Sequence, residues 1–204
     1  MARPSARRTV ENALRRLGFD RVAGVDEVGR GCLAGPVVAA AVVLDPDAHV
    51  AHLADSKLVP AEERDELSGH IVARARAWAV AVVEPAEIDR INIHRASLQA
   101  MRTAVGMMAP LPDVVLVDGF RIPDLAIPQR GIVKGDRRCA AIAAAWIVAK
   151  VARDRLMVAL HGHDPRYGFD RHKGYATAEH LDAVARYGYS EWHRRSFRPP
   201  TLFD

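Results

Sequence analysis

Two adjacent carboxylates, Asp26 and Glu27, lie inside an otherwise apolar run that reads GVDEVGRG over residues 24–31. Carboxylates in such a setting are costly unless a cation neutralises them, and hard oxygen ligands of this kind suit Mg²⁺ or Mn²⁺. Side chains alternate between the faces of a regular strand, so both acids reach one metal site only if the strand is bulged or a backbone carbonyl contributes. Glycines 29 and 31 favour such a distorted strand end. The alternative is a strand end with two solvated acids.

Two further acids follow short apolar runs. Asp118 ends the run VVLVDG at 114–119, a position at the tip of a buried strand where open α/β sheets place ligands. A turn-forming Asp-Gly pair explains it equally well. Asp136, in the triplet KGD at 134–136, precedes a long helical segment. It joins the same site, caps that helix, or does both.

Basic and aromatic residues alternate near the C-terminus. The segment HKGY at 172–175 follows YGF at 167–169 and precedes HRRSF at 193–197. This mixture suits a nucleic-acid backbone together with a stacked sugar or base, and a charged surface with tyrosines packed on the core is the alternative. A further triplet, DSK at 55–57, either places Lys57 near a phosphate or caps the next helix.

Charge is unevenly distributed along the chain. The total is +4, but residues 1–129 hold 15 basic and 17 acidic groups, whereas residues 130–204 hold 14 basic and 8 acidic groups. The C-terminal third, with its net charge of +6, is therefore the expected polyanion contact. Only four of the 29 basic residues are lysines. This arginine bias either suits bidentate phosphate binding or reflects the base composition of the genome.

The elements that must position these groups follow from apolar patterning and turn residues. Strands are predicted over 22–28, 36–44, 78–83, 114–117 and around 132–133. Helices are predicted over 6–17, 60–76, 86–108 with a break near Asn92, 137–160 and 177–186. Early strands close together, followed by alternating helices and strands, indicate an α/β fold. We expect a mixed sheet of about five strands, an antiparallel meander extended by parallel strands and flanked by helices.

Length and composition limit the remaining classes. The 204 residues fit one domain over 1–204, in which residues about 160–204 form a basic helical extension that binds substrate. No apolar run reaches the ~18 residues of a membrane span, and the basic N-terminus leads into no secretory signal. Cys32 and Cys139 form no disulfide framework, which is typical of a reducing cytosol, so a cytoplasmic protein is expected.

Taken in order, these segments resemble the type 2 ribonuclease H family, and in particular bacterial ribonuclease HII. The resemblance runs from about residue 22 to 198. Besides the runs quoted above, it includes LAGPV at 33–37, EIDRINI at 87–93, IAAA at 142–145 and AKVARDR at 149–155. Each piece alone is weak, and the ordered set is specific.

The resemblance implies a ribonuclease H-like fold and four catalytic acids that hold two divalent ions, Mn²⁺ or Mg²⁺. These acids map to Asp26, Glu27, Asp118 and Asp136. It also implies that the Gly29-Arg30-Gly31 backbone reads the ribose 2′-hydroxyl, the group that separates RNA from DNA. Tyr175 would stack on the deoxyribose beyond an RNA–DNA junction. Further substrate contacts are assigned to Lys57, His172 and Lys173.

The implied activity is that of a monomeric endoribonuclease. It would hydrolyse the RNA strand of RNA–DNA hybrids and cut 5′ of ribonucleotides embedded in duplex DNA, leaving 5′-phosphate and 3′-hydroxyl ends. Type 3 relatives carry an extra N-terminal domain, for which no room precedes Asp26, and ribonuclease HI lacks adjacent first acids. Two alternatives are a non-catalytic hybrid-binding module and a metal-dependent phosphatase for small phosphoesters.

Overall fold

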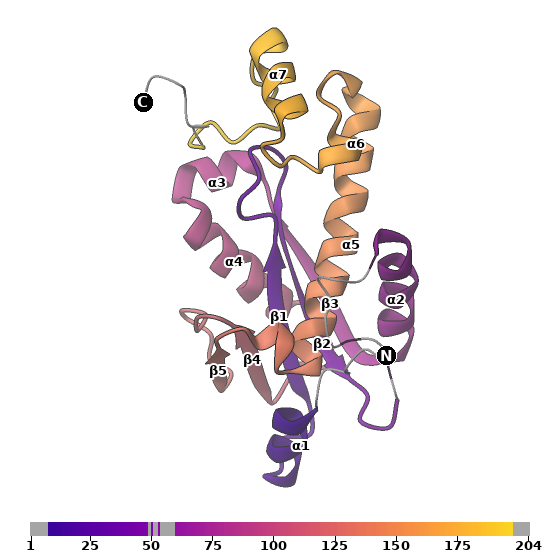
Figure 1. The fold of residues 1–204 in the computed structure, drawn as a ribbon. Coiled ribbons are helices and arrows are strands. Elements are labelled where there is room, and N and C mark those ends of the chain that lie inside the picture. Colours follow the sequence, from indigo (N-terminus) through magenta and orange to yellow (C-terminus); the bar gives the residue numbers. More distant parts are fainter. Residues whose placement is uncertain (1–7, 49, 51–52, 54–59, 198–204) are drawn as a thin grey trace.

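The computed structural model describes residues 8–48, 50, 53 and 60–197. Its centre is one five-stranded sheet with the order β3-β2-β1-β4-β5 (Figure 1). The strands are β1 Val22–Val28, β2 Val37–Leu44, β3 Ala75–Val83, β4 Val114–Asp118 and β5 Gln129–Ile132. β1, β2 and β3 pair antiparallel, while β4 and β5 add in parallel to β1. The predicted mixed sheet is therefore confirmed.

The strand that carries the paired acids is regular. β1 pairs with β2 in an unbroken register through Asp26↔Ala40 and Glu27↔Ala39. The bulge that the sequence favoured at this point is absent, because continuous pairing with the fully buried β2 holds the strand straight. Asp26 and Glu27 consequently leave β1 on opposite faces.

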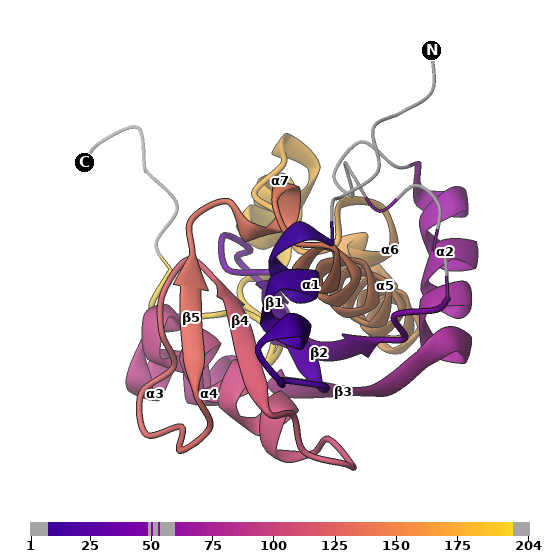
Figure 2. The same ribbon diagram turned by 90° about the horizontal axis from the view of Figure 1, so that it is seen from below.

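Helices cover both faces of the sheet (Figure 2). α3 Pro85–Ile91 and α4 Ile93–Gly106 lie on one face, and α5 Ala140–His163 lies on the other with α1 Thr9–Arg16 and α2 Ala61–Arg74. The short α6 Phe169–His172 and α7 Ala178–Tyr187 sit at the far end of α5. None of the helices in the described ranges is long and apolar enough to cross a membrane.

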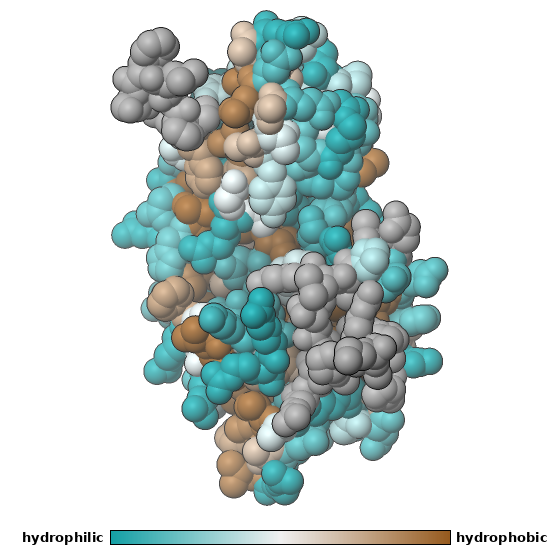
Figure 3. Space-filling view, in the orientation of Figure 1, coloured by the Kyte–Doolittle hydropathy of each residue, from teal (hydrophilic) through white to brown (hydrophobic). Residues whose placement is uncertain are grey.

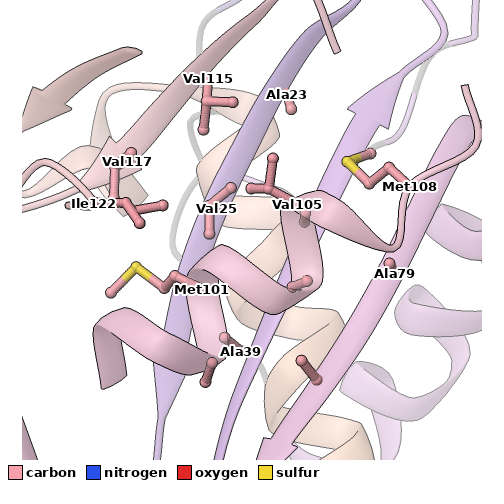
Figure 4. Packing of buried hydrophobic residues seen from close by; sticks show 14 of the residues in the cluster. Ala23, Val25, Ala39, Ala79, Met101, Val105, Met108, Val115, Val117 and Ile122 are labelled. Carbon is pink, nitrogen blue, oxygen red and sulfur yellow. The ribbon is translucent and has the colours of Figure 1, made fainter. Parts of the chain in front are cut away.

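Small and branched residues let the layers approach closely. On the α4 face, Met101 and Val105 pack against Val25 and Val117 of the sheet (Figure 4). On the other face, a Cβ at Gly24 would lie 2.1 Å from the backbone of Ala141, so only glycine lets α5 rest directly on β1.

Element boundaries differ from the prediction where local signals compete. The predicted break at Asn92 is confirmed, since α3 ends and α4 begins there. The helix predicted from 137 begins instead at Ala140, and its N-cap is Cys139 without a side-chain hydrogen bond. Asp136 is therefore not its cap. It lies in the short 3₁₀ helix η2 Gly135–Arg137.

Candidate active site

Parallel pairing brings two acids together. β1 and β4 pair through Gly24↔Leu116 and Val25↔Val117, so the next step of the register sets Asp26 beside Asp118. Leu116 packs with Ile142 of α5, and a Cβ at Gly24 would point to α5 as well. Because side chains alternate along a strand, Asp26 and Asp118 share this α5 face.

Asp26 lies in a buried and strongly acidic environment. Its side chain is 3% exposed, and its Oδ1 accepts a hydrogen bond from the Glu27 amide at 2.7 Å. Burial raises the pKa of Asp26 well above its ordinary value, and the charges of Glu27, Asp118 and Asp136 raise it further. A cation placed among these groups would relieve both effects.

The KGD triplet completes the acidic cluster. The Gly135 amide donates to Oδ1 of Asp118 at 2.7 Å, which joins η2 to the tip of β4. A Cβ at Gly135 would lie 2.6 Å from Cδ1 of Ile142 and 3.2 Å from the Asp118 carboxylate, so a larger residue would require these side chains to shift. Asp136 follows directly and is 4% exposed.

Glu27 points away from its neighbour and is held by Arg30. The Arg30 Nη1 lies 2.9 Å from Oε1 of Glu27. Burial raises the pKa of Glu27, the Arg30 hydrogen bond and charge lower it, and the charge of Asp118 raises it. The charges of the four acids thus act on one another, although Asp26 and Glu27 leave β1 on opposite faces.

The donor set suits divalent cations, although the side chains do not form a closed cage. Within the described ranges, no three His, Cys, Asp or Glu side chains are grouped closely enough to hold an ion. The four acids still provide hard oxygen ligands, and their charges raise the pKa of Asp26, so the site combines the ligand type that Mg²⁺ and Mn²⁺ prefer with a concentration of negative charge.

The glycine loop after β1 is shaped by a buried arginine. Gly29 has φ +90°, and a Cβ there would lie 2.2 Å from Nε of Arg153. Arg153 is 1% exposed and donates to the carbonyls of Pro36, Ala34 and Lys173 at 2.9, 3.1 and 2.9 Å. By contrast, a Cβ at Gly31 would meet open space.

Tyr175 is presented on a turn next to this loop. Its side chain is 45% exposed, and Arg153 joins the loop to the turn through the Lys173 carbonyl. Lys173 has φ 52° and directs its ammonium group to the Asp170 carbonyl. Lys57, the remaining predicted substrate contact, lies outside the described residues.

Comparison with known proteins identifies this arrangement. The sequence profile of the family described as Ribonuclease HII matches residues 23–199. The chain belongs to the ribonuclease HII family. Ribonuclease HII of Nitrosococcus oceani is 53% identical over 183 residues, which cover 90% of this chain and 91% of that protein. Ribonuclease HII of Solibacter usitatus is 50% identical over 191 residues, 94% of this chain and 83% of that protein.

Solved structures share the fold. The chain is similar to ribonuclease H2 from Pyrococcus horikoshii, with a TM-score of 0.72 at 23% identity over 87% of this chain and 93% of that one. It is also similar to the ribonuclease HII of the Archaeoglobus fulgidus PCNA complex, with a TM-score of 0.73 at 25% identity over 90% and 98% of the two chains. A Bst ribonuclease HIII in complex with Mn²⁺ matches at a TM-score of 0.71 and 23% identity, over 91% of this chain and 69% of that one.

Membership establishes the general activity. A ribonuclease HII is a metal-dependent hydrolase of the type 2 ribonuclease H class, and it acts as an endonuclease on RNA–DNA hybrids. The predicted family, fold and enzyme class are therefore confirmed.

Two side chains of the basic-aromatic segment, Arg194 and His193, lie inside the protein. Arg194 is 0% exposed and donates from Nε to the Gly35 carbonyl at 2.9 Å and from Nη1 to the Arg30 carbonyl at 3.1 Å. His193 is 2% exposed. Of the two interpretations of this segment, contact with a nucleic-acid backbone does not fit these two side chains, because both are buried and Arg194 supplies partners to the carbonyl groups of the glycine loop.

His172 is also an internal group. It is 8% exposed, its Nδ1 accepts from the Gly174 amide at 3.1 Å, and its Nε2 lies 2.6 Å from the Tyr167 carbonyl. A ring nitrogen that accepts from an amide carries no proton, so Nε2 donates to Tyr167. Both nitrogens are thus occupied in shaping the turn that presents Tyr175.

The sequence did not predict a chain of hydrogen bonds that runs from His193 through His180 to the Tyr175 carbonyl, which we call the histidine relay. The Ser190 amide donates to Nδ1 of His193 at 3.0 Å, so the proton of His193 is on Nε2, which donates to Nε2 of His180 at 3.0 Å. His180 in turn donates from Nδ1 to the Tyr175 carbonyl at 2.9 Å. Burial and the charge of His180 lower the pKa of His193 to about 4. No spacing in the sequence indicates this relay, since three separate segments form it.

Proposed function

We propose that this chain cuts the phosphodiester bond on the 5′ side of a ribonucleotide and leaves 5′-phosphate and 3′-hydroxyl ends. Its substrates are RNA–DNA hybrids and DNA duplexes that contain single ribonucleotides. The observation that carries the proposal is the cluster of Asp26, Glu27, Asp118 and Asp136, whose charges act on one another beside an exposed glycine loop.

The acids would hold two divalent cations, Mn²⁺ or Mg²⁺. Two such ions supply an activated water and stabilise the leaving 3′-oxygen in an in-line displacement. Four carboxylates match the charge of two divalent ions, which supports the use of all four. The Gly35 and Arg30 carbonyls are fixed by Arg194, so the peptide groups of the loop are ordered before substrate binds. We assign to this loop the reading of the 2′-hydroxyl.

A cleavage assay tests the proposal. The substrate is a labelled DNA duplex with one embedded ribonucleotide, incubated with Mn²⁺ or Mg²⁺ in a concentration series beside an all-DNA duplex. We expect a single cut 5′ of the ribonucleotide that Asp118→Asn abolishes. Asp182→Asn, which changes an exposed carboxylate paired with Arg186 at 3.0 Å, is the matched control and keeps activity. Full activity of Asp118→Asn, or metal-independent cleavage, contradicts the proposal.

Tyr175 is assigned to stacking on the sugar beyond the RNA–DNA junction. Its half-exposed ring lies beside the loop, which supports this assignment. Stacking on an aromatic ring contributes about 1–3 kcal/mol, so Tyr175→Ala should lose roughly 10-fold or more of the cleavage rate at a single ribonucleotide. Tyr175→Phe keeps the ring and should retain most of it. Equal losses in both variants would assign the effect to the hydroxyl instead.

The cellular setting completes the proposal. We propose that the protein acts as a monomer, an expectation that the sequence raised. Cys32 and Cys139 are buried free thiols, which supports a reducing compartment such as the cytoplasm. Light scattering of the purified protein tests the first point, since a stable dimer would contradict it.

A further inference from the structure

Four basic side chains form an unpaired surface at the start of α5. We define the β5–η2 patch as Arg130, Lys134, Arg137 and Arg138. All four are exposed, and none makes a side-chain hydrogen bond or ion pair with another residue in the part of the chain that the structure describes. The acids closest to them in sequence are unavailable, because Asp124 lies 3.6 Å from Arg102 and Asp136 is buried.

Most of the described basic groups beyond residue 138 have partners within the chain, and the exposed Arg195 is the exception among the described residues. Arg153 and Arg194 are buried on backbone carbonyls. Others pair with acids in five bridges, Lys150–Asp154, Arg155–Asp65, Arg166–Asp164, Arg171–Glu179 and Arg186–Asp182. Much of the positive charge beyond residue 138 is thus paired or buried, whereas the four side chains of the β5–η2 patch, which belong to the same C-terminal third, are exposed and have no side-chain partner among the described residues.

Two members of the patch that are separated in sequence, Arg130 and Arg138, act on the same buried group. Burial raises the pKa of the Cys139 thiol to about 12, and the charges of Arg138 and Arg130 both act against that increase. Both guanidinium groups are therefore within electrostatic range of one sulfur atom. Figure 3 shows that hydrophilic residues cover most of this face of the molecule.

The patch and Tyr175 flank the acidic cluster. β1 runs alongside α5, with Gly24 beside Ala141 and Gly29 beside Arg153, so Asp26 lies between these two levels. The helical rise separates Ala141 from Arg153 by about 18 Å. The patch adjoins the start of α5, and the turn of Tyr175 is bonded to Arg153. A duplex that crosses the acids along the direction of α5 would therefore meet both the patch and Tyr175.

We propose that the β5–η2 patch binds the phosphate backbone of the substrate duplex on the side of the acids away from Tyr175. The inference rests on the proposed function, because it states how the same substrate is held. Guanidinium groups without intramolecular partners are suited to bidentate contact with phosphate oxygens. Charges on an edge strand also hinder unwanted strand pairing, but only Arg130 belongs to β5, and the other three residues follow the strand.

Equilibrium binding as a function of salt tests the patch. The probe is a fluorescent DNA duplex with one ribonucleotide, measured without divalent metal so that no cleavage occurs. Each lost duplex phosphate contact lowers the slope of log affinity against log salt by about 0.9. For Arg130→Gln/Arg137→Gln/Arg138→Gln we expect a slope reduced by about 2–3 and an affinity reduced by at least about 10-fold near 100 mM salt.

A matched triple variant removes the same charge from the paired groups. Arg155→Gln/Arg171→Gln/Arg186→Gln breaks three of the exposed bridges and should change the slope by less than about 1. Equal slopes in the two variants would reduce the effect to net charge and overturn the proposal. An unchanged slope in the patch variant together with new self-association would assign the patch to edge protection and also overturn it.

The proposed function is tested by cleavage, whereas the patch is tested by the salt dependence of binding, so the two can fail separately. If the parent protein cuts the embedded ribonucleotide and the patch variant binds like the parent, only the patch assignment fails. If the parent does not cut but the two variants differ in slope as expected, the cleavage proposal fails and the patch assignment stands.

Discussion

At the scale of single residues, the candidate site contains a conflict between stability and function. Asp26 is almost completely buried among three other acids, and each of them raises its pKa. Such an arrangement costs folding free energy unless cations are bound, as is common where a site must hold charge. Because of this cost, a substitution that removes charge from the site should change the free energy of unfolding.

The first prediction concerns this cost. Without divalent metal at neutral pH, Asp26→Asn should raise the free energy of unfolding by about 1–2 kcal/mol, because it removes a buried charge and keeps an oxygen for the Glu27 amide. Added Mn²⁺ should raise the melting temperature of the parent and have little effect on the variant. Thermal unfolding with EDTA and with Mn²⁺ measures both effects. A variant less stable than the parent in EDTA would contradict the prediction.

The two glycines of the loop allow a second residue-scale prediction. Gly29→Ala introduces a Cβ at φ +90° and 2.2 Å from Arg153, so it should destabilise the fold by about 2–4 kcal/mol. Gly31→Ala meets open space and should leave stability within about 1 kcal/mol. Chemical denaturation of both variants measures the difference. If Gly31→Ala also lowers cleavage while it remains stable, the added methyl group obstructs substrate rather than the fold.

At the scale of elements, caps and corners join the secondary structure. Glu11 of α1 is buried and accepts from the Ala141 amide at 2.9 Å, so one helix satisfies the first turn of another. At the corner between α3 and α4, Asn92 has φ 69° and ψ 161°, a region that favours glycine. Its side chain accepts from the Arg95 amide at 3.1 Å. The corner therefore combines a strained backbone with a stabilising cap.

Two substitutions of Asn92 distinguish the effect of the strained backbone on stability from the effect of the cap. Asn92→Ala loses the cap and keeps the strain, so the free energy of unfolding should fall by about 1–2 kcal/mol. Asn92→Gly relieves the strain and loses only a few tenths of a kcal/mol from the cap, so it should be neutral or stabilising. Urea titration of the two variants decides the matter. The same loss in both would show that the cap alone matters.

At the scale of the whole molecule, the C-terminal segment ties the sheet to the turn of Tyr175. Arg194 reaches the glycine loop, and the Arg195 and Ser196 amides donate to Asp89 of α3 at 2.8 and 2.9 Å. The histidine relay connects the same segment to Tyr175 through His193 and His180. Loss of the relay should therefore be visible in global stability.

The pH dependence of unfolding tests the relay. The pKa of His193 is lowered from 6.5 to about 4, so its contribution is complete above pH 6.5 and falls as the pH drops toward 4. The unfolded chain binds the proton first in this window, and the loss reaches roughly 3 kcal/mol. His193→Asn should be less stable at pH 7 and flatter between pH 6.5 and 4. His70→Gln, at an exposed position of α2, is the control. A variant with the same pH slope as the parent would contradict the assignment.

Local pattern in the sequence determined much of this protein. The apolar strands, the acids at their ends and the break at Asn92 all follow from signals within a few residues. The resemblance added the grouping of Asp26, Glu27, Asp118 and Asp136. The bounds of β3, β5 and α5 and the regularity of β1 were predicted wrongly, because pairing with neighbouring strands and packing on Gly24 outweigh local preference.

The tertiary structure alone decided which basic groups remain available to a partner. Arg153 is bonded to the carbonyl of Pro36, 117 positions away, and Arg155 to Asp65, 90 positions away. A net charge counted along the sequence does not reveal such pairs, since they depend on long-range contacts that form only when α5 packs on the sheet. For this reason the C-terminal third is basic throughout its composition, while its exposed basic groups without a side-chain partner, among the residues that the structure describes, are Arg195 and the four members of the β5–η2 patch.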